Sequence, residues 1–413
     1  MVLLMTKGIE NKPLSTWALL ASLYITQYLG VSFFIVAMVA ILREQGAPLE
    51  RVSLVYLLGI FGACKFLWAP LVDRFRLSHR CGHYQGWLLV TQSGLALGLV
   101  AIGSVDITTD FTTLYTLCLL VTLCSASQDI AVDGLACRLL TPAERGMGNG
   151  LQTAGGLLSY LIGGGLVLIL YPYLGWRTCL WMLAAGTAIS LIQLPFFREP
   201  VWPEARLPAR QMLYRFTFEF SGSARGWLPV VLCYATGIAI AWSILIPLLI
   251  DAGWEMDRVG LVVNVQGSVA GFISALLTGW LVRHITRRQA LKLAALSQAM
   301  AVVAIVVPVQ GYTSGTAVSL AVCLYFFGYN AAMTVLSTLM MDRASPQAPA
   351  TDYTLQFSLY QGSGMLMGAC SLWLAGQVGY SAVYSSAVFT ALLALVLSVR
   401  YSPEEGVCHD AVR

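Results

Sequence analysis

Charged residues are scarce in this sequence of 413 residues: Asp, Glu, Lys and Arg make up 11% of it, against 58% hydrophobic residues. A soluble domain carries roughly a quarter charged residues. A chain with this balance cannot hide its apolar surface inside one water-soluble core, so it belongs in a membrane. The formal net charge of +4 is too small to indicate binding to nucleic acid.

The sequence also lacks the motifs of common catalytic and metal sites. The ten cysteines stand singly without a CxxC pair, and the four histidines fall in predicted loops or in the tail. No stretch resembles a phosphate-binding P-loop, an H-E-x-x-H zinc site or a Ser-His-Asp triad. We therefore expect no enzyme activity, no cofactor, no bound metal, and no energy taken from ATP bound to this chain.

Apolar runs long enough to cross a bilayer recur along the whole chain. The first run is much longer than the apolar region of a cleavable signal peptide, so we expect it to be retained. The pattern predicts an all-α membrane protein with twelve transmembrane helices. The runs cover residues 14–42, 51–72, 86–104, 111–134, 147–171, 176–197, 228–250, 259–283, 288–309, 315–341, 352–376 and 380–399.

The longest polar connection, Arg198 to Trp227, divides these runs into six and six. It contains three prolines and five arginines, a composition typical of an interdomain linker. The second run and the eighth run also end alike, in residues 69–76 and 279–288. We therefore predict an N-terminal half over 1–197, a linker over 198–227, a C-terminal half over 228–400 and a tail over 401–413.

Lysine and arginine placement predicts the orientation. If the N-terminus is cytoplasmic, nineteen of the 24 Lys and Arg residues fall in segments on the cytoplasmic side and four fall on the other side. The remaining one, Lys65, lies within the second run. Both termini are therefore predicted to be cytoplasmic.

Two carboxylates interrupt the fourth run. An acidic group at this depth costs about 2.5–3.5 kcal/mol on insertion scales, so Asp129 and Asp133 require a reason to be there. Their i, i+4 spacing places both on one helix face, about 6 Å apart at Cβ. Two carboxylates this close in a low dielectric resist ionising together. The pair is therefore a candidate site for holding and releasing a proton.

Lys65 is the one cation deep in a predicted span. A buried lysine must pair, lose its charge or extend toward the interface. One interpretation is a switchable ion pair with Asp129 or Asp133, in which protonation of the carboxylate frees Lys65 for an anionic substrate. The alternative is a lysine that reaches the interface and anchors the second helix.

Candidate substrate-binding residues differ in character between the halves. In the first half, an amide and a hydroxyl flank the carboxylates and either bind substrate or satisfy the polar helix face. The second half offers aromatic rings and amides, which also have packing or interface roles as an alternative. The candidates are Gln128, Ser125, Trp242, Tyr325, Tyr329, Asn330, Tyr360 and Gln361.

The short loop after the second run contains Asp73, Arg74 and Arg76. It resembles the signature loop of the major facilitators, G-x-x-x-D-R-x-G-R-R, although Ala69 replaces the first glycine and the later Gly-Arg element is degraded. In that family the aspartate caps a neighbouring helix and pairs with arginine. The resemblance implies a cytoplasmic gate here; the alternative is ordinary anchoring by positive charge.

Four segments resemble the AmpG-type branch of the major facilitators, which includes muropeptide permeases, acetyl-CoA transporters and RhtX/FptX-type siderophore importers. The resemblance implies a monomeric, proton-driven importer of a small molecule in the bacterial inner membrane, with Lys65, Asp73, Gln128, Asp129 and Asp133 at shared positions. The segments are residues 65–74, 86–89, 124–130 and 142–146.

Within that branch, length and the aromatic second half favour import of a ferric siderophore of the pyochelin kind. The alternative is import of an anhydro-muropeptide by the same machinery. Efflux is disfavoured because the fifth run lacks the proline of its usual signature. An intramembrane aspartyl protease is disfavoured because such proteases carry their two aspartates on two different helices, whereas Asp129 and Asp133 are spaced i, i+4 on one helix. A sensor that does not transport stays open.

Overall fold

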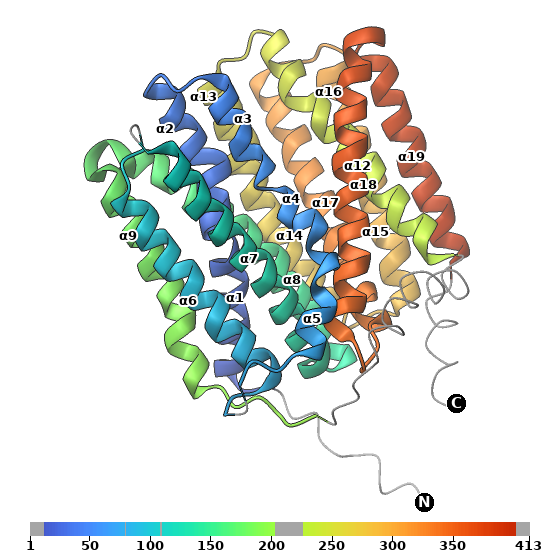
Figure 1. The fold of residues 1–413 in the computed structure, drawn as a ribbon. Coiled ribbons are helices and arrows are strands. Elements are labelled where there is room, and N and C mark those ends of the chain that lie inside the picture. The colour runs from blue at the N-terminus through green and yellow to red at the C-terminus, as the bar shows by residue number, and fades with distance from the viewer. Residues whose placement is uncertain (1–11, 79, 108–109, 203–225, 402–413) are drawn as a thin grey trace, which may run out of the picture.

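A computed structural model describes residues 12–78, 80–107, 110–202 and 226–401. The regular secondary structure of the described residues is entirely helical, with no strand among them. The helices form one bundle in which α1 (Leu14–Ser32) begins and α19 (Tyr380–Arg400) ends at the same end (Figure 1), called the lower end below. Most of the predicted linker and tail, residues 203–225 and 402–413, lies outside the described residues.

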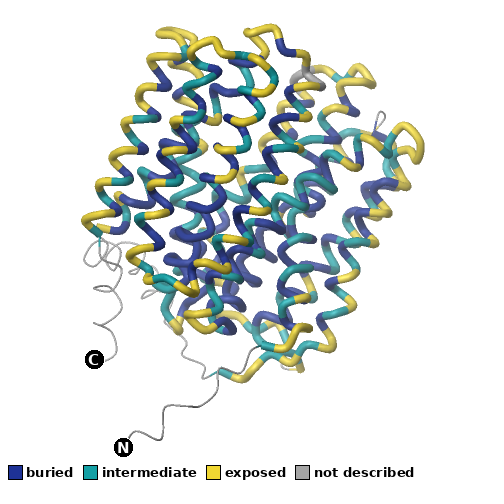
Figure 2. Tube along the Cα trace, turned by 180° about the vertical axis from the view of Figure 1, so that it is seen from behind, coloured by how far each residue is buried: buried dark blue, intermediate teal, exposed yellow. Residues whose placement is uncertain are grey.

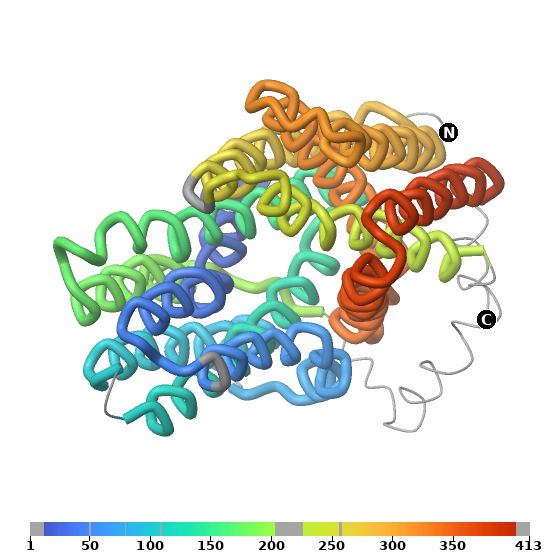
Figure 3. Tube along the Cα trace, turned by 90° about the horizontal axis from the view of Figure 1, so that it is seen from above, coloured from blue at the N-terminus to red at the C-terminus, as the bar shows by residue number. Residues whose placement is uncertain are grey.

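The first half of the chain forms one side of the bundle (Figure 3). Its first helix is continued without a break by a π-helical turn and then by α2. Its remaining elements follow in pairs that run up and down the bundle. They are η1 (Phe33–Met38), α2 (Val39–Glu44), α3 (Leu49–Leu57), α4 (Ile60–Cys64), η2 (Lys65–Leu67), α5 (Ala69–Arg74), α6 (His83–Ser104), α7 (Phe111–Leu139), α8 (Pro142–Ser159), η3 (Tyr160–Leu166), α9 (Val167–Gln193) and η4 (Leu194–Phe196).

The predicted helix over 51–72 is broken in the structure. The chain passes from α4 into the 3₁₀ turn η2 and restarts as α5. Pro70 explains the break, because proline has no N–H and its ring clashes with the carbonyl four residues earlier, here that of Phe66. Lys65 begins the 3₁₀ turn and is therefore held at an irregular point of the backbone.

The second half forms the other side of the bundle and repeats the same plan. Its fourth long helix, α17, has 29 residues, as does α7 of the first half. The helix after it is the longest of this half, with 30 residues. The elements are α12 (Trp227–Asp251), α13 (Met256–Val259), η6 (Gly260–Gln266), α14 (Gly267–Leu281), α15 (Arg287–Ala304), α16 (Val306–Val309), α17 (Gly315–Arg343), α18 (Pro349–Val378) and α19.

Nine helices of the described chain are long and apolar enough to cross a membrane. One of them, Pro142–Phe196, has 55 residues and contains a non-helical residue, Gly175 (φ 73°, ψ 174°), shortly after Pro172. A positive φ is accessible to glycine at no steric cost, so the chain can reverse there. Two consecutive helices result, as predicted for 147–171 and 176–197. The total of twelve spans and the side on which the termini lie stay predictions.

Three apolar cores hold the bundle together. At the upper end each half has its own core, around Phe33 and Leu180 in the first half and around Ile244 and Val322 in the second. At the lower end a single core joins residues of both halves, among them Leu20 and Met341. Buried residues are accordingly concentrated toward the lower end of the bundle (Figure 2). The two halves are therefore packed on each other most tightly at the end where α1 begins and α19 ends.

Candidate functional site

Lys65 and Asp129 form an ion pair deep in the first half. The ammonium contacts Asp129 Oδ2, and the two side chains are 1% and 3% exposed. Gln27 Nε2 donates to Asp129 Oδ1 at 3.2 Å, and the Tyr28 hydroxyl donates to Oδ2 at 3.0 Å. Both carboxylate oxygens thus have donors, which is what a buried charged pair needs. Of the two partners predicted for Lys65, the structure selects Asp129.

Asp133, one helical turn away on α7, has a different environment. The Tyr24 hydroxyl lies 3.3 Å from Asp133 Oδ1, and Gln152 Nε2 donates to the same oxygen at 2.9 Å. The other oxygen, Oδ2, is buried without a partner in the described structure. A carboxyl group with one unoccupied buried oxygen is well suited to carry a proton, because a buried ionised carboxylate without full pairing is costly.

A hydrogen-bonded chain connects Asp133 to the other half of the molecule. Gln152 of α8 accepts from the Tyr353 hydroxyl of α18 at 2.9 Å, and the same hydroxyl lies 3.3 Å from Asn149 Oδ1. The side chains of Asp133, Asn149, Gln152 and Tyr353 are all buried. A change at Asp133 can therefore reach the interface between the halves through two hydrogen bonds.

An aromatic pocket of about 430 Å³ lies in the second half, between α12, α17 and α18. Trp242 stacks on Tyr325, with ring centroids 5.9 Å apart and planes 15° apart. Tyr325 in turn stacks on Tyr329 at 6.3 Å. The structure gathers five of the eight predicted substrate-binding residues here: Trp242, Tyr325, Tyr329, Tyr360 and Gln361.

The ion pair and the aromatic pocket are connected by one ring. Lys65 Nζ lies 4.6 Å from the centroid of Phe357, a cation–π distance. The Phe357 ring lies 6.4 Å from that of Tyr360, which lines the pocket. A ligand in the pocket therefore lies close to the charged pair of the opposite half.

Three predicted substrate-binding residues do not line this pocket. Ser125 donates to the Gln27 carbonyl at 2.6 Å, Gln128 reaches the Leu23 carbonyl at 3.4 Å, and Asn330 donates to the Phe326 carbonyl at 2.7 Å. Each is buried and bound to backbone, so in this conformation each satisfies helix packing. Their role toward substrate stays a prediction.

Sequence reasoning missed several polar residues of the site. Tyr24, Gln27 and Tyr28 share a helix face by their spacing, and a glutamine in the otherwise apolar first run was a usable signal. Phe357 carried no such signal, because a phenylalanine in an apolar run reads as packing. Among the described residues, no group of three or more His, Cys, Asp or Glu is placed to hold a metal ion.

The predicted gate residue Asp73 caps a helix of the opposite half. Its carboxylate accepts from the backbone N–H of Thr351 at 2.7 Å, from the Thr351 hydroxyl at 2.7 Å and from the Tyr84 hydroxyl at 2.6 Å. This placement at the start of α18 agrees with the resemblance. Asp73 thereby ties the first half to the second at the lower end.

The arginine pairing that the resemblance implies for Asp73 is not seen among the described residues. In the described part of the chain, Asp73 has no arginine partner because Tyr84 and Thr351 supply its donors. Arg76 donates from Nη2 to the Cys81 carbonyl at 2.5 Å, and Arg74 lies over the Phe75 ring at 5.6 Å. Both arginines therefore hold or flank their own loop.

The lower end is closed by further contacts between the halves. Asp342 of α17 accepts from Arg145 of α8 at 2.9 Å and from Arg287 of α15 at 2.6 Å. The backbones of α8 and α14 approach closely, so that a Cβ added at Gly146 would lie 2.9 Å from the Gly279 carbonyl oxygen. Asp342 was not among the predicted gate residues.

Comparison with known proteins now decides the family. Residues 20–369 match the model of the Major Facilitator Superfamily. The chain belongs to this superfamily. It is therefore a multi-pass membrane transporter of the major facilitator type, and the all-helical major facilitator fold expected from the sequence is confirmed.

Relatives of known name narrow the branch of this major facilitator. It is 28% identical over 365 residues to the anhydromuropeptide permease of Escherichia coli strain K12, covering 86% of this chain and 73% of the permease. It is 21% identical over 375 residues to a Rickettsia conorii transporter named AmpG 4, covering 86% and 88%. The AmpG-type resemblance is confirmed, whereas these findings give no support to the siderophore branch.

Solved structures agree on the fold. The transporter FucP in its outward conformation has a TM-score of 0.70 at 15% identity, covering 93% of this chain and 98% of FucP. A bacterial homologue of ferroportin in an outward-facing state has a TM-score of 0.67 at 17% identity, covering 94% and 99%. At these identities the likeness concerns the fold of this major facilitator and not its substrate.

Proposed function

We propose that this major facilitator imports a cell-wall fragment of the anhydromuropeptide class across the bacterial inner membrane, together with protons. The observation that carries the proposal is the position of the Lys65–Asp129 pair beside an aromatic pocket of the opposite half. The similarity to a named anhydromuropeptide permease over 86% of the chain supports the ligand class.

The proposed proton site is the pair Asp129 and Asp133 together with Lys65. Protonation of Asp129 removes its attraction for the ammonium, so that Lys65 becomes available to an anionic group of the substrate. A peptide carboxylate of a cell-wall fragment is such a group. Asp133 then passes the change in charge at Asp129 to the second half through its hydrogen bond with Gln152 and the hydrogen bond of Gln152 with Tyr353.

The proposed substrate site is the pocket of Trp242, Tyr325, Tyr329, Tyr360 and Gln361. Apolar and aromatic walls with few polar groups are the usual composition of a small-molecule site. The apolar face of a sugar ring packs well on such rings, and Gln361 offers both a donor and an acceptor.

A second candidate ligand is a ferric siderophore with aromatic rings. The composition of the pocket favours it, because sugar sites usually hold more amide and acid groups than the single Gln361. We rank it second, since the named relatives support a muropeptide. The predicted gate (Asp73, Arg74 and Arg76), inner-membrane location and monomeric state belong to either proposal.

The deciding experiment measures uptake of labelled anhydro-muropeptide in cells with and without this chain, with a proton uncoupler as control. Uptake that requires the chain and collapses with the uncoupler supports the proposal. A parallel arm uses radioactive iron bound to pyochelin. Uptake in that arm alone would replace the first ligand with the second, and no uptake in either arm would refute both.

A further inference from the structure

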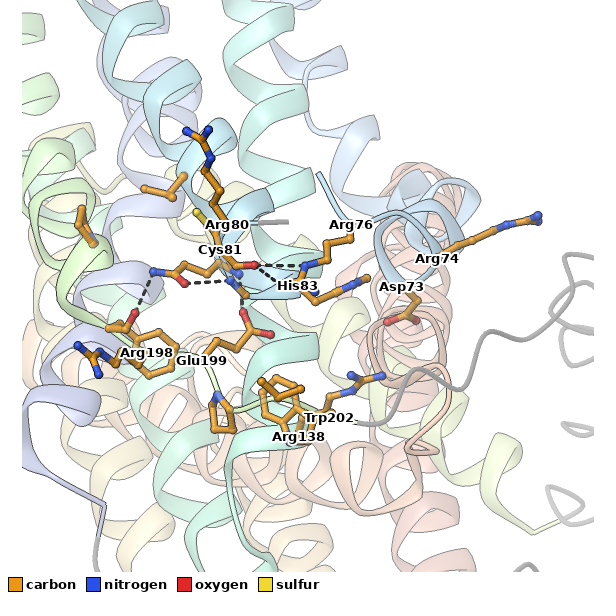
Figure 4. Close-up of a pocket in the computed structure, with 17 residues that line it drawn as sticks. Asp73, Arg74, Arg76, Arg80, Cys81, His83, Arg138, Arg198, Glu199 and Trp202 are labelled. Carbon is orange, nitrogen blue, oxygen red and sulfur yellow. Dashed lines mark hydrogen bonds between the residues drawn. The ribbon is translucent and has the colours of Figure 1, made fainter. Parts of the chain in front are cut away.

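A second cavity, of about 550 Å³, lies at the lower end of the first half, between the α5–α6 loop, Arg138 of α7 and residues 195–202 (Figure 4). It is separate from the aromatic pocket and shares no lining residue with it. Five arginines and two carboxylates line it. The arginines are Arg74, Arg76, Arg80, Arg138 and Arg198, and the carboxylates are Asp73 and Glu199.

Among the described residues, neither carboxylate forms an ion pair with these arginines. Asp73 accepts from Tyr84 and Thr351, as described above. Glu199 accepts from the backbone N–H groups of Tyr84 at 3.2 Å and Gln85 at 2.7 Å, at the start of α6. Burial raises the pKa of Glu199, and these two N–H donors, together with the nearby charges of His83 and Arg138, oppose that rise. Within the described residues, none of the five arginines forms an ion pair, so the cavity holds an excess of positive charge.

Arg138 is the best-placed of the five to hold an anion. Its guanidinium lies between the rings of Tyr84 at 5.6 Å and Trp202 at 5.4 Å, which fixes its plane. Nη2 donates to the Pro346 carbonyl at 3.2 Å, while the buried Nε has no partner in the described structure. In Figure 4, Arg76 and Arg138 lie nearer the middle of the cavity than Arg74 and Arg80, whose side chains extend outward.

Planar guanidinium groups match the oxygen atoms of phosphate better than any other side chain, because they present several N–H donors in one fork. Basic cavities between transmembrane helices on the cytoplasmic side suit phospholipid headgroups for the same reason. Here large apolar side chains are exposed near the cavity: Phe196 is 85% and Val201 97% exposed. They offer a surface for acyl chains beside the charged groups.

We propose that this cavity binds a phosphate-bearing anion, and that the headgroup of an anionic phospholipid fits its surroundings best. The inference is independent of the transported substrate. Because Tyr84 contacts both Arg138 and Asp73, an anion bound here acts on the residues that hold the lower end closed. The bound state therefore favours the closed arrangement of that end.

The test measures the melting temperature of the purified full-length protein in detergent with added phosphatidylglycerol, phosphatidylcholine or inorganic phosphate. We expect phosphatidylglycerol to raise it by about 3 °C or more over phosphatidylcholine at saturation. An equal rise with millimolar inorganic phosphate would assign the site to a soluble anion. Equal effects of the two lipids, with none from phosphate, would overturn the proposal.

Variants localise the effect. Arg138→Gln should reduce the specific rise by at least half, and the double variant Arg80→Gln/Arg198→Gln should reduce it without a folding defect, since both side chains are exposed at the rim. Arg177→Gln, at the upper end over Trp181, is the matched control and should keep the full rise. If Arg138→Gln fails to fold, the double variant decides. An undiminished rise in the double variant and in Arg138→Gln would refute the site.

Discussion

Corresponding helices of the two halves carry opposite chemistry. α7 and α17 have the same length, and counted from their first residues Asp129 corresponds to Met333 and Asp133 to Ser337. The middle of α7 holds both buried carboxylates, whereas α17 turns Tyr325 and Tyr329 toward a pocket. One fold repeated twice thus separates the ionisable groups from the aromatic groups. A ligand between the halves meets both, and any relative motion of the halves changes what it contacts.

The strongest test of this division is Asp129→Asn. We expect uptake to fall to background, because the variant cannot ionise and leaves Lys65 buried without its counter-charge. Leaving a buried charge unpaired costs about 3–5 kcal/mol, so the melting temperature should fall as well. Proteoliposome uptake and thermal unfolding measure the two effects.

The double variant Asp129→Asn/Lys65→Met is the control for stability. It removes both charges, so it should regain most of the lost melting temperature and still fail to transport. Transport by Asp129→Asn at the wild-type rate would remove Asp129 from the proton site and with it the contrast between the halves.

Substitutions of Lys65 and Arg76 compare a cation of the buried ion pair with a cation of the α5–α6 loop. We expect Lys65→Ala to reduce uptake by about tenfold or more, which corresponds to about 1.4 kcal/mol. Arg76→Ala should reduce it less, because Arg76 holds the carbonyls of Ser78 and Cys81 in its own loop and is not part of the buried ion pair. Uptake rates normalised to membrane expression compare the two, and the reverse order would favour an anchoring role for Lys65.

The aromatic side of the contrast rests on Trp242. Trp242→Ala should raise the KM for substrate by about tenfold, or about 1.4 kcal/mol, because it removes one wall of the stacked pocket. Trp373→Ala is the matched control, since this side chain is 71% exposed on the outside of the bundle. Equal effects of the two substitutions would mean that the pocket does not bind the substrate.

Asp342 is a charged residue in the half that carries the aromatic pocket. Its substitution should affect uptake less than the substitutions above. Asp342 pairs with arginines from both halves near the end of α17, so its role is to hold the lower end closed. Asp342→Asn should change uptake by only about twofold to fivefold, in line with about 1 kcal/mol for a partly exposed pair. It should also increase thiol labelling of Cys137, which is buried and whose carbonyl accepts from Arg145. Complete loss of proton coupling would instead make Asp342 part of the proton site.

The all-helical fold could be predicted from hydropathy, because a membrane imposes span length on the sequence. The orientation that arginine and lysine placement indicates stays a prediction. The break of the second helix at Lys65 was not predicted, although Pro70 in the sequence indicated it. The sequence narrowed the partner of Lys65 to Asp129 or Asp133. It could not choose between them, because hydropathy does not determine how a helix is rotated about its axis. For the same reason the sequence left open whether Ser125 and Gln128 bind substrate or satisfy the polar helix face. In the structure both contact α1, and their role toward substrate stays a prediction. The Tyr353–Gln152 bond joins residues 201 positions apart and had no local signal.

The single core that both halves share at the lower end has a consequence for energy balance. If this end opens, the apolar surface between Leu20 and Met341 must separate, at about 25 cal/mol for each Å² newly exposed to water. A comparable area has to become buried at the upper end for the two arrangements to remain close in free energy. At the upper end each half already buries its own core, so only the surfaces that the halves turn toward each other around these cores can supply that area. The size of those surfaces sets how evenly the molecule divides its time between facing one side of the membrane and facing the other.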